Sequence, residues 1–350
     1  MSSTPPTATD AGMAPEVSPH VRMAHVMDGY LTTQALYVVA ELGIADLLAD
    51  GPRTAADLAT QAGADPEALH RVLRLLAAEG IFEETDGGFG LTPLGNLLHE
   101  DVPGSQRGAC LARGLVYFDA VGGLLCAVRE GGVAFEHVHG QSLFDYLGER
   151  PELGAAFQDS MVARSTQEAA EVVAAHDFSG YRRLVDVGGG TGVLLAAILR
   201  ATPGLRGVLF NRPQVVEAAG RRLQEVGVTD RSETAGGDFF AEVPPGGDAY
   251  LLARVIHDWS DADSLRVLAT VRRAMGQDSR LLLVEAVLPE RAVEQPGAVR
   301  MDVHMLILLH GRERTAAEFA DLLARAGFRL TRLVPTASPA GIAVIEAIPV

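Results

Sequence analysis

The feature that most constrains the fold of this chain is the segment 184–213, which reads LVDVGGGTGVLLAAILRATPGLRGVLFNRP. A buried-type apolar strand runs into three consecutive glycines, a helical stretch follows, and a second apolar strand ends at Asn211. Further apolar strands, in AYLLARVI and RLLLVEAVL, alternate with helical stretches through the rest of the second half. This alternation predicts an α/β fold, with a parallel sheet covered by helices on both faces.

The first half of the chain has mainly helical periodicity instead. Residues 52–98 are predicted to form a helix, a turn, a second helix and two short strands around Gly87 and Gly88, which is the pattern of a winged helix. A winged helix often binds DNA, but residues 52–100 carry three basic and eight acidic side chains, a net charge of −5. Phosphate would repel such a surface. We therefore expect this module to pack against another subunit.

Composition excludes several other classes of protein. The net charge of −16 argues against a polyanionic partner. The two cysteines, Cys110 and Cys126, lack the CxxC spacing of a metal or redox site. Residues 1–17 are rich in Pro, Thr and Ala, which predicts a disordered tail, and no apolar run is long enough to span a bilayer. We expect a cytoplasmic protein that binds neither nucleic acid nor membranes.

These patterns predict four segments. Residues 1–17 form the tail, and residues 18–102 form the winged-helix-like domain. Residues 103–178 form a helical connector that ends in a long helix, and residues 179–350 form a Rossmann-like catalytic domain.

The glycine turn is a candidate ligand site. Glycines permit a tight turn and let a ligand approach the backbone closely. The dinucleotide pattern GxGxxG is absent, because Gly188, Gly190 and Gly192 are spaced as GxGxG. Asp186 directly precedes the glycines, where its carboxylate would repel a phosphate but attract a cationic amino group. A ligand with ammonium and sulfonium charges is therefore favoured over a dinucleotide.

The ends of the next strands supply further candidates. Asn211 lies where a side chain would bind ribose hydroxyls. In GGDFF, Asp238 can accept a hydrogen bond from an adenine amino group, and Phe239 or Phe240 can pack on the ring. His257 follows the strand AYLLA, and Ser260 is placed to cap the helix after it.

Four ordered motifs carry a family resemblance: LVDVGGGTG, GDFF, RVIHDWSDADSLRVL and GRERTAAEFADLLARAGF. Together they resemble the S-adenosylmethionine-dependent O-methyltransferases that act on small aromatic molecules, both the plant caffeate type and the bacterial polyketide-tailoring group. The resemblance covers nearly the whole chain from about residue 20. It implies a Rossmann-like class I methyltransferase sheet, an N-terminal winged-helix-like dimerisation domain, S-adenosylmethionine as cofactor, a small aromatic substrate and a homodimer.

The resemblance also implies roles for individual residues. His257 matches the catalytic histidine of the family, and Glu285 and Glu313 match the two carboxylates that flank it. A phenol has a pKa of about 10, so it needs a base at neutral pH, and an imidazole is suited to that task. A structural histidine and a surface glutamate between Arg312 and Arg314 remain the alternative interpretation. The expected cofactor contacts are Asp186, Gly188, Gly190, Asn211, Gly237, Asp238, Phe239, Phe240 and Arg254.

The acceptor pocket is expected along the long helix before residue 178 and the helix in MDVHMLILLHG. Its candidate lining residues are Phe118, Phe157, Met161, Met301, Asp302 and Met305. His304 and His310 lie six residues apart, which does not place two ligands on one helical face, so no metal site is expected.

Asn211 departs from the family pattern, which has Asp or Glu there. Asparagine loses the charge and one acceptor. The change is either tolerated with weaker cofactor binding, a substitution peculiar to this chain, or a sign of drift from methyl transfer. The leading hypothesis is methylation of a phenolic hydroxyl on an aromatic natural product. A hydroxylase-like or cyclising homologue that retains the cofactor, and a transcriptional regulator, are the alternatives.

Overall fold

A computed structural model describes residues 18–350, so the tail predicted for residues 1–17 lies outside the described part. The chain divides into two compact units, one ending at Asn96 and the other beginning at Leu97. Between residues 18 and 350 no single helix is both long and apolar enough to cross a membrane. One helix pair, Arg107–Val121 and Leu124–Glu130, meets these criteria only jointly and is bent by 48°.

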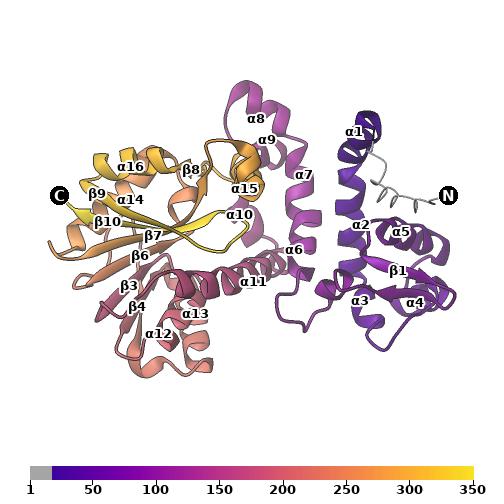
Figure 1. Cartoon of the computed structure of the whole chain (residues 1–350), viewed down its shortest axis with the longest axis horizontal. Helices are drawn as coiled ribbons and strands as arrows, with labels where there is room; N and C mark the ends of the chain where they lie inside the picture. Colours follow the sequence, from indigo (N-terminus) through magenta and orange to yellow (C-terminus); the bar gives the residue numbers. More distant parts are fainter. Residues whose placement is uncertain (1–17) are drawn as a thin grey trace, which may run out of the picture. The chain divides into compact units, whose positions relative to one another are not determined.

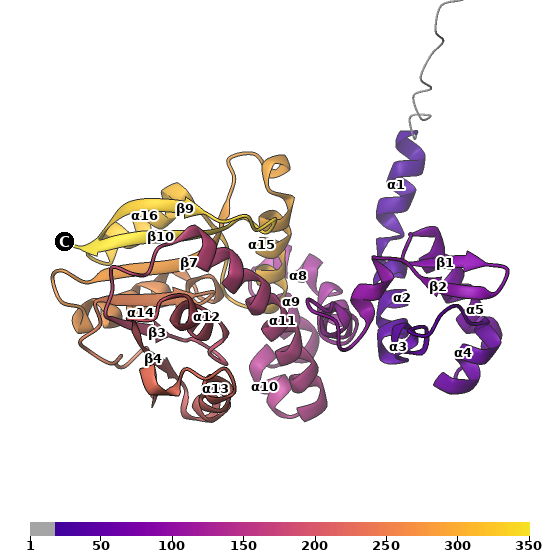
Figure 2. The same cartoon turned by 60° about the horizontal axis from the view of Figure 1, so that its bottom comes forward.

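The first unit has the predicted order of helices followed by a short hairpin (Figure 2). Thr54 and Asp65 cap the two helices of the helix-turn-helix part with their side-chain oxygens. The hairpin strands are antiparallel, with Phe82 opposite Leu91. The elements of this unit are α1 (Pro19–Met27), α2 (Gly29–Glu41), α3 (Ile44–Leu47), α4 (Ala55–Ala62), α5 (Pro66–Ala78), β1 (Phe82–Thr85) and β2 (Gly88–Leu91).

The second unit begins with helices. One continuous helical stretch contains a π-helical turn, η2 (Arg113–Tyr117), between α6 and α7. The long helix expected before residue 178 is α11, which starts with a proline in its first turn. The helices are α6 (Arg107–Ala112), α7 (Phe118–Val121), α8 (Leu124–Glu130), α9 (Ala134–His139), α10 (Leu143–Gly148) and α11 (Pro151–Ala175).

The rest of the second unit is an eight-stranded sheet with the order β5-β4-β3-β6-β7-β10-β9, and β8 pairs with β7. The strands are β3 (Arg183–Val187), β4 (Arg206–Asn211), β5 (Ser232–Gly236), β6 (Ala249–Ala253), β7 (Arg280–Leu288), β8 (Arg314–Thr315), β9 (Phe328–Pro335) and β10 (Ile342–Pro349). The helices are α12 (Val193–Ala201), α13 (Pro213–Glu225), α14 (Asp261–Ala274), α15 (Pro296–Leu308) and α16 (Ala316–Arg325).

The sheet is mixed, whereas the sequence predicted a parallel one. The pairs formed among strands β3 to β8 are all parallel. Strand β10, in contrast, is antiparallel to both β7 and β9. Only a short loop joins β9 to β10, and such a connection produces an antiparallel pair, because a parallel pair needs a long crossover.

Alternate residues of the central strands face two separate cores. Helices lie on both faces of the sheet (Figure 1). Val185 and Leu252 belong to the core that α14 and α16 cover, while Leu184 and Leu251 belong to the core covered by α11, α12 and α13. Helices therefore cover both faces of the sheet, as predicted.

This topology determines where a ligand site can form. From β3 the chain proceeds to β4 on one side and later returns to β6 on the other side. The carboxyl ends of β3 and β6 thus meet at a topological switch point, which is the usual ligand crevice of open α/β sheets.

A loop between α15 and β8 closes over the segment that follows β6. A Cβ added to Gly311 would collide with the backbone of His257 and Asp258, so only glycine permits this approach. The buried Arg314, just beyond, donates hydrogen bonds to the carbonyl oxygens of Ile256 and Trp259 at 3.2 and 3.1 Å. The loop and the post-β6 segment are therefore fixed to each other.

We predict that Gly311→Ala lowers the free energy of unfolding by about 1–3 kcal/mol, because two backbone segments must separate to admit the methyl group. Urea denaturation measures this change. Gly180→Ala is the matched control, since a Cβ there would meet no atom within 4 Å, and it should stay within about 0.5 kcal/mol of wild type. An unchanged midpoint for Gly311→Ala would show that the contact is not needed.

Candidate active site

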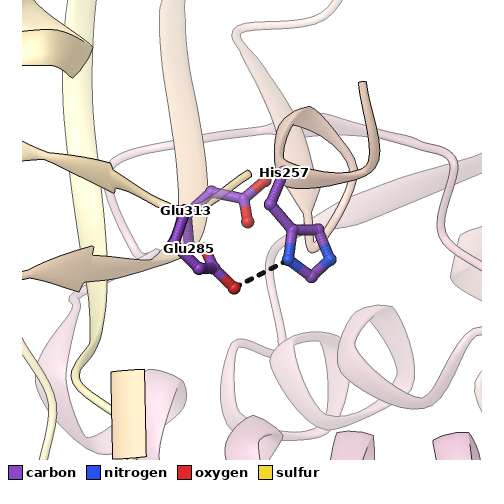
Figure 3. A group of neighbouring side chains, drawn as sticks. All are labelled: His257, Glu285 and Glu313. Atoms are coloured by element: carbon purple, nitrogen blue, oxygen red, sulfur yellow. Dashed lines mark hydrogen bonds and ion pairs between the residues drawn. The ribbon is translucent and has the colours of Figure 1, made fainter. Parts of the chain in front are cut away.

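His257 lies in a 3-10 turn, Ile256–Asp258, at the carboxyl end of β6. Glu285 on β7 holds this turn, because its Oε1 accepts hydrogen bonds from the backbone amides of Val255 (3.1 Å) and Ile256 (2.8 Å). Figure 3 shows His257 facing the carboxylates of Glu285 and Glu313. The sequence placed Glu285 beside the imidazole, and the structure adds that its bonded partners are backbone amides.

Glu313 is the direct partner of the imidazole. Its Oε1 lies 2.9 Å from His257 Nδ1, and both side chains are buried. Burial opposes ionisation of Glu313, but the hydrogen bond and the positive charges of His257 and Arg254 outweigh it and lower the Glu313 pKa. With an exposed fraction of 1%, Glu313 is not the surface residue that the alternative interpretation allowed. Asp302 accepts a hydrogen bond from the Glu313 amide at 2.9 Å and so anchors its backbone.

Carboxylates also set the charge state of His257. Burial and the Arg254 charge lower its pKa, but Asp258, Glu285 and the hydrogen bond to Glu313 together raise the pKa above the ordinary value of 6.5. Asp258 lies at the other ring nitrogen, with Oδ1 3.2 Å from Nε2. Its own pKa is raised, chiefly by burial. Asp258 follows His257 in the motif RVIHDWSDADSLRVL, but the sequence predicted no role for it.

Arg254 completes this cluster. Its backbone has a φ of 56°, a left-handed conformation that is costly for a non-glycine residue. That conformation accompanies an ion pair in which Nη1 lies 3.3 Å from Glu313 Oε1. Ligand-type atoms of His257, Glu285 and Glu313 lie within 4.8 Å of one another, a spacing that could hold a metal ion. A cation there would have to compete with the Arg254 guanidinium for Glu313.

A cavity of about 300 Å³ adjoins the cluster at the switch point. Among the expected cofactor residues, it is lined by Asp186, Gly188, Gly190, Asn211 and Arg254, and Met161 from the expected acceptor set also lines it.

Asp186 shows what kind of ligand this cavity suits. It is fully buried, and neither carboxylate oxygen has a hydrogen-bond partner within residues 18–350. Burial raises its pKa to about 7. A Cβ at Gly189 would collide with this carboxylate, so the glycine leaves room for the carboxylate beside the turn. A buried carboxylate without a partner is stabilised by a cationic ligand.

Asn211 also faces this cavity, but its oxygen is already engaged. Oδ1 accepts a hydrogen bond from the Arg212 amide at 2.7 Å, which leaves the amide nitrogen to contact a ligand. The carbonyl acceptor expected from the sequence is therefore not free in this arrangement.

The expected adenine contacts are less directly placed. Asp238 Oδ1 accepts a hydrogen bond from the Phe240 amide at 2.9 Å, and both phenylalanine rings pack against Trp259. Gly237 approaches the ring of Phe210 closely. The Phe239 ring lies 3.7 Å from the position of a Cβ on Gly188, so it borders the turn although it does not line the cavity.

The acceptor candidates lie on three helices of the second unit: Phe118 on α7, Phe157 and Met161 on α11, and Met301, Asp302 and Met305 on α15. Phe157 on α11 stacks with Tyr117 at 6.4 Å between ring centroids, and Tyr117 makes an edge contact of 5.0 Å with His304 on α15. Met305 is buried on α15. Neither Tyr117 nor His304 belongs to a motif. The sequence therefore predicted no pocket role for Tyr117, and His304 was weighed only as a metal ligand.

The model of the O-methyltransferase domain matches residues 122–329, and that of the O-methyltransferase dimerisation domain matches residues 24–101. The chain belongs to this O-methyltransferase family. A phenazine O-methyltransferase, PhzM, from Lysobacter antibioticus is 46% identical over 94% of this chain and 96% of the relative.

Solved structures agree with this assignment. The crystal structure of LaPhzM has a TM-score of 0.90 at 45% identity, covering 95% of this chain and all of that chain. The O-methyltransferase NcsB1 from neocarzinostatin biosynthesis, solved with S-adenosylmethionine and 2-hydroxy-5-methyl naphthoic acid, has a TM-score of 0.79 at 32% identity, covering 91% and 96%. A phenazine-1-carboxylate N-methyltransferase from Pseudomonas aeruginosa is 38% identical over 89% of this chain and 92% of the relative.

The protein is therefore an S-adenosylmethionine-dependent methyltransferase. The buried, unpartnered carboxylate of Asp186 and the glycine turn beside it fit a cofactor that carries ammonium and sulfonium charges.

We predict that Glu313→Gln lowers the pKa of His257 in this methyltransferase, because a neutral amide no longer stabilises the imidazolium. NMR titration of the ring signal that disappears in His257→Ala measures it, and the wild-type value should lie above 6.5. Glu290→Gln is an exposed control that should leave the titration unchanged. An unshifted His257 pKa in Glu313→Gln would contradict the pairing.

Proposed function

We propose that this methyltransferase transfers the methyl group of S-adenosylmethionine to a phenolic hydroxyl of an aromatic natural product, with His257 as the general base. The observation that carries the proposal is the His257–Glu313 pair, buried beside the cavity that contains Asp186. Bound S-adenosylmethionine supplies an electrophilic methyl group. The protein's remaining tasks are to hold the acceptor oxygen and to remove its proton.

Each residue of the cluster has a distinct task in this proposal. Nε2 of His257 accepts the hydroxyl proton, while Glu313 at Nδ1 fixes the tautomer and stabilises the imidazolium that results. Glu285 positions the turn that carries the imidazole. The acceptor hydroxyl must displace Asp258 from Nε2, and the Asp258 side chain, 29% exposed, has room to turn away.

The cofactor contacts follow from the cavity. Asp186 holds the cationic amino group near Gly188 and Gly190, Asn211 contacts the ribose, and Arg254 lines the inner wall. Gly237, Asp238, Phe239 and Phe240 are proposed for the adenine, which requires the Asp238 side chain to exchange its bond with the Phe240 amide. Phe157, Met161 and Met305 are proposed for the acceptor ring, with Asp302 supporting the Glu313 loop.

The active form is proposed to be a homodimer. Helix α1 has no buried residue, and Val21, Met23, Val26 and Met27 on it are exposed. Apolar surface of this kind is stabilised by a partner, and α1 overlaps the matched dimerisation domain.

We predict that His257→Ala lowers turnover by roughly 10²- to 10⁴-fold, the usual contribution of a general base, with little change in cofactor affinity. Transfer from labelled S-adenosylmethionine to 2-hydroxy-5-methyl naphthoic acid and 1-hydroxyphenazine measures it, with His137→Ala, an exposed histidine on α9, as control. A pre-ionised nitrophenol should recover part of the loss. For wild type, kcat/KM should rise as the pH increases through the His257 pKa, above 6.5, because only the neutral ring accepts a proton. Near-full activity of His257→Ala on a weakly acidic phenol would refute the base, and transfer to aromatic amines alone would make the enzyme an N-methyltransferase.

We predict that Asn211→Asp tightens S-adenosylmethionine binding about fivefold to tenfold, as expected for roughly 1–1.4 kcal/mol. One Asp oxygen can keep the bond from the Arg212 amide while the other accepts a charge-assisted bond from the ribose. Calorimetry measures affinity, and turnover at saturating cofactor should barely change because the ribose contact is equal in ground and transition states. Unchanged or weaker binding would show that the cavity requires asparagine.

A further inference from the structure

A second, smaller cavity of about 80 Å³ lies between α6 and α11. Its lining contains two arginines, Arg113 and Arg164, and no acidic side chain. That composition is unusual in a chain where 45 acidic residues outnumber 29 basic ones. The remaining lining residues are Gln106, Ala109, Ala112, Tyr117, Ser160, Ala163 and Gln167.

The half-buried guanidinium of Arg164 lacks the carboxylate partners that the buried arginines Arg254 and Arg314 have. Arg314 donates to the Asp261 carboxylate at 2.7 Å, and Arg254 pairs with Glu313. Within residues 18–350, Arg164, which is half-buried, donates only to the sulfur atoms of Met161 (3.4 Å) and Met301 (3.7 Å). A thioether is a weak acceptor, so the strong donors of Arg164 are poorly used.

Arg113, the other arginine of the lining, is exposed. Its hydrogen bond runs to the carbonyl oxygen of Ala109 in its own helix, at 3.3 Å. It opens the π-helical turn that ends at Tyr117, and both of these residues line the small cavity. Such turns are rare and frequently occur at functional sites.

The pKa of His304 reflects its burial and the positive charge of this region. Burial, together with the charges of Arg113 and Arg164, lowers its pKa to about 4. The ring is therefore neutral, and its buried Nδ1 has no partner within the described chain. The cavity lining that includes Tyr117 thus supplies two positive charges and no acidic side chain.

Arg164 also connects this region to the reaction centre. Met161, which it contacts, lines the cofactor cavity, and the Arg164 charge acts on Asp258 beside His257. An acceptor molecule whose anionic group binds Arg164 would therefore extend its ring toward Tyr117, Phe157 and the catalytic histidine.

We infer that Arg113 and Arg164 form a carboxylate-binding subsite, so that the preferred acceptor is an aromatic carboxylic acid. The inference rests on the proposed function and narrows its substrate class. A guanidinium forms a paired, charge-assisted contact with a carboxylate, and the cavity is large enough for a carboxylate while the ring remains outside it. The subsite selects acidic acceptors over neutral ones.

The test compares 2-hydroxy-5-methyl naphthoic acid with its carboxamide, which has the same ring and no charge. Calorimetry with protein saturated with S-adenosylhomocysteine measures binding of each compound. Wild type should bind the acid more tightly than the amide. Arg164→Gln, and to a smaller degree Arg113→Gln, should weaken acid binding by about 10- to 100-fold while leaving the amide and S-adenosylmethionine affinities within about threefold. Arg129→Gln, an exposed charge removal on α8, should change none of these affinities.

The alternatives give different results. Equal affinity of wild type for acid and amide, or acid affinity unaffected in both variants, would overturn the subsite. So would a loss of S-adenosylmethionine affinity in Arg164→Gln, because the arginine would then serve the cofactor. An equal loss of acid affinity in Arg129→Gln would show that the effect comes from the overall charge of the protein and would overturn the subsite. Methyl transfer to both compounds without discrimination would leave the proposed function standing and refute the subsite. Arginine-dependent acid binding without transfer would refute the function and leave the subsite.

Discussion

The active site depends on one buried contact. A single oxygen of Glu285 accepts hydrogen bonds from the backbone amides of both Val255 and Ile256. A short turn at the end of a strand leaves its amides unpaired, and burying them without acceptors would destabilise the fold. Glu285 lies on the neighbouring strand β7, so the sheet itself supplies the acceptor. The turn is thereby fixed with His257 directed at Glu313, and the proposed catalytic pair inherits the rigidity of the central sheet.

That arrangement concentrates ionisable groups where charge is costly. Burial raises the pKa of Glu285 to about 7, while the pKa of Glu313 is lowered despite its burial, through His257 and Arg254. The two carboxylates therefore differ in role: Glu313 holds the negative charge, and Glu285 chiefly accepts backbone hydrogen bonds. Arg254 supports this division by pairing with Glu313 from a strained backbone position. Strain of this kind persists only where the surrounding structure determines it fully, which is common at functional sites.

The sequence predicted the parts of the site that follow local rules. Strand ends, the glycine turn and the cap at Ser260 depend on residues close in the chain, and the structure has them where expected. His257 and Glu313 were predicted from their motifs, although 56 residues separate them. Side chains brought together by packing alone were missed: the role of Asp258 depends on a rotamer, and Arg164 meets Met301 across 137 residues. The antiparallel edge of the sheet was missed because no pattern in β9 or β10 was weighed.

Two groups of opposite charge near the proposed catalytic histidine have no charged hydrogen-bond partner within residues 18–350. Asp186 is a buried carboxylate without a cation, and Arg164 is a half-buried guanidinium whose partners are thioethers. Each is unfavourable in the protein alone, because a desolvated charge needs a counter-charge. A cationic cofactor satisfies the first, and the acidic acceptor inferred for the second subsite satisfies the other. The same electrostatics that orient each ligand separately keep them from exchanging places, since each charged group would repel the wrong ligand. Binding energy of this kind orients the two reactants without any contact at the reacting atoms, and it leaves His257 to act only on the proton.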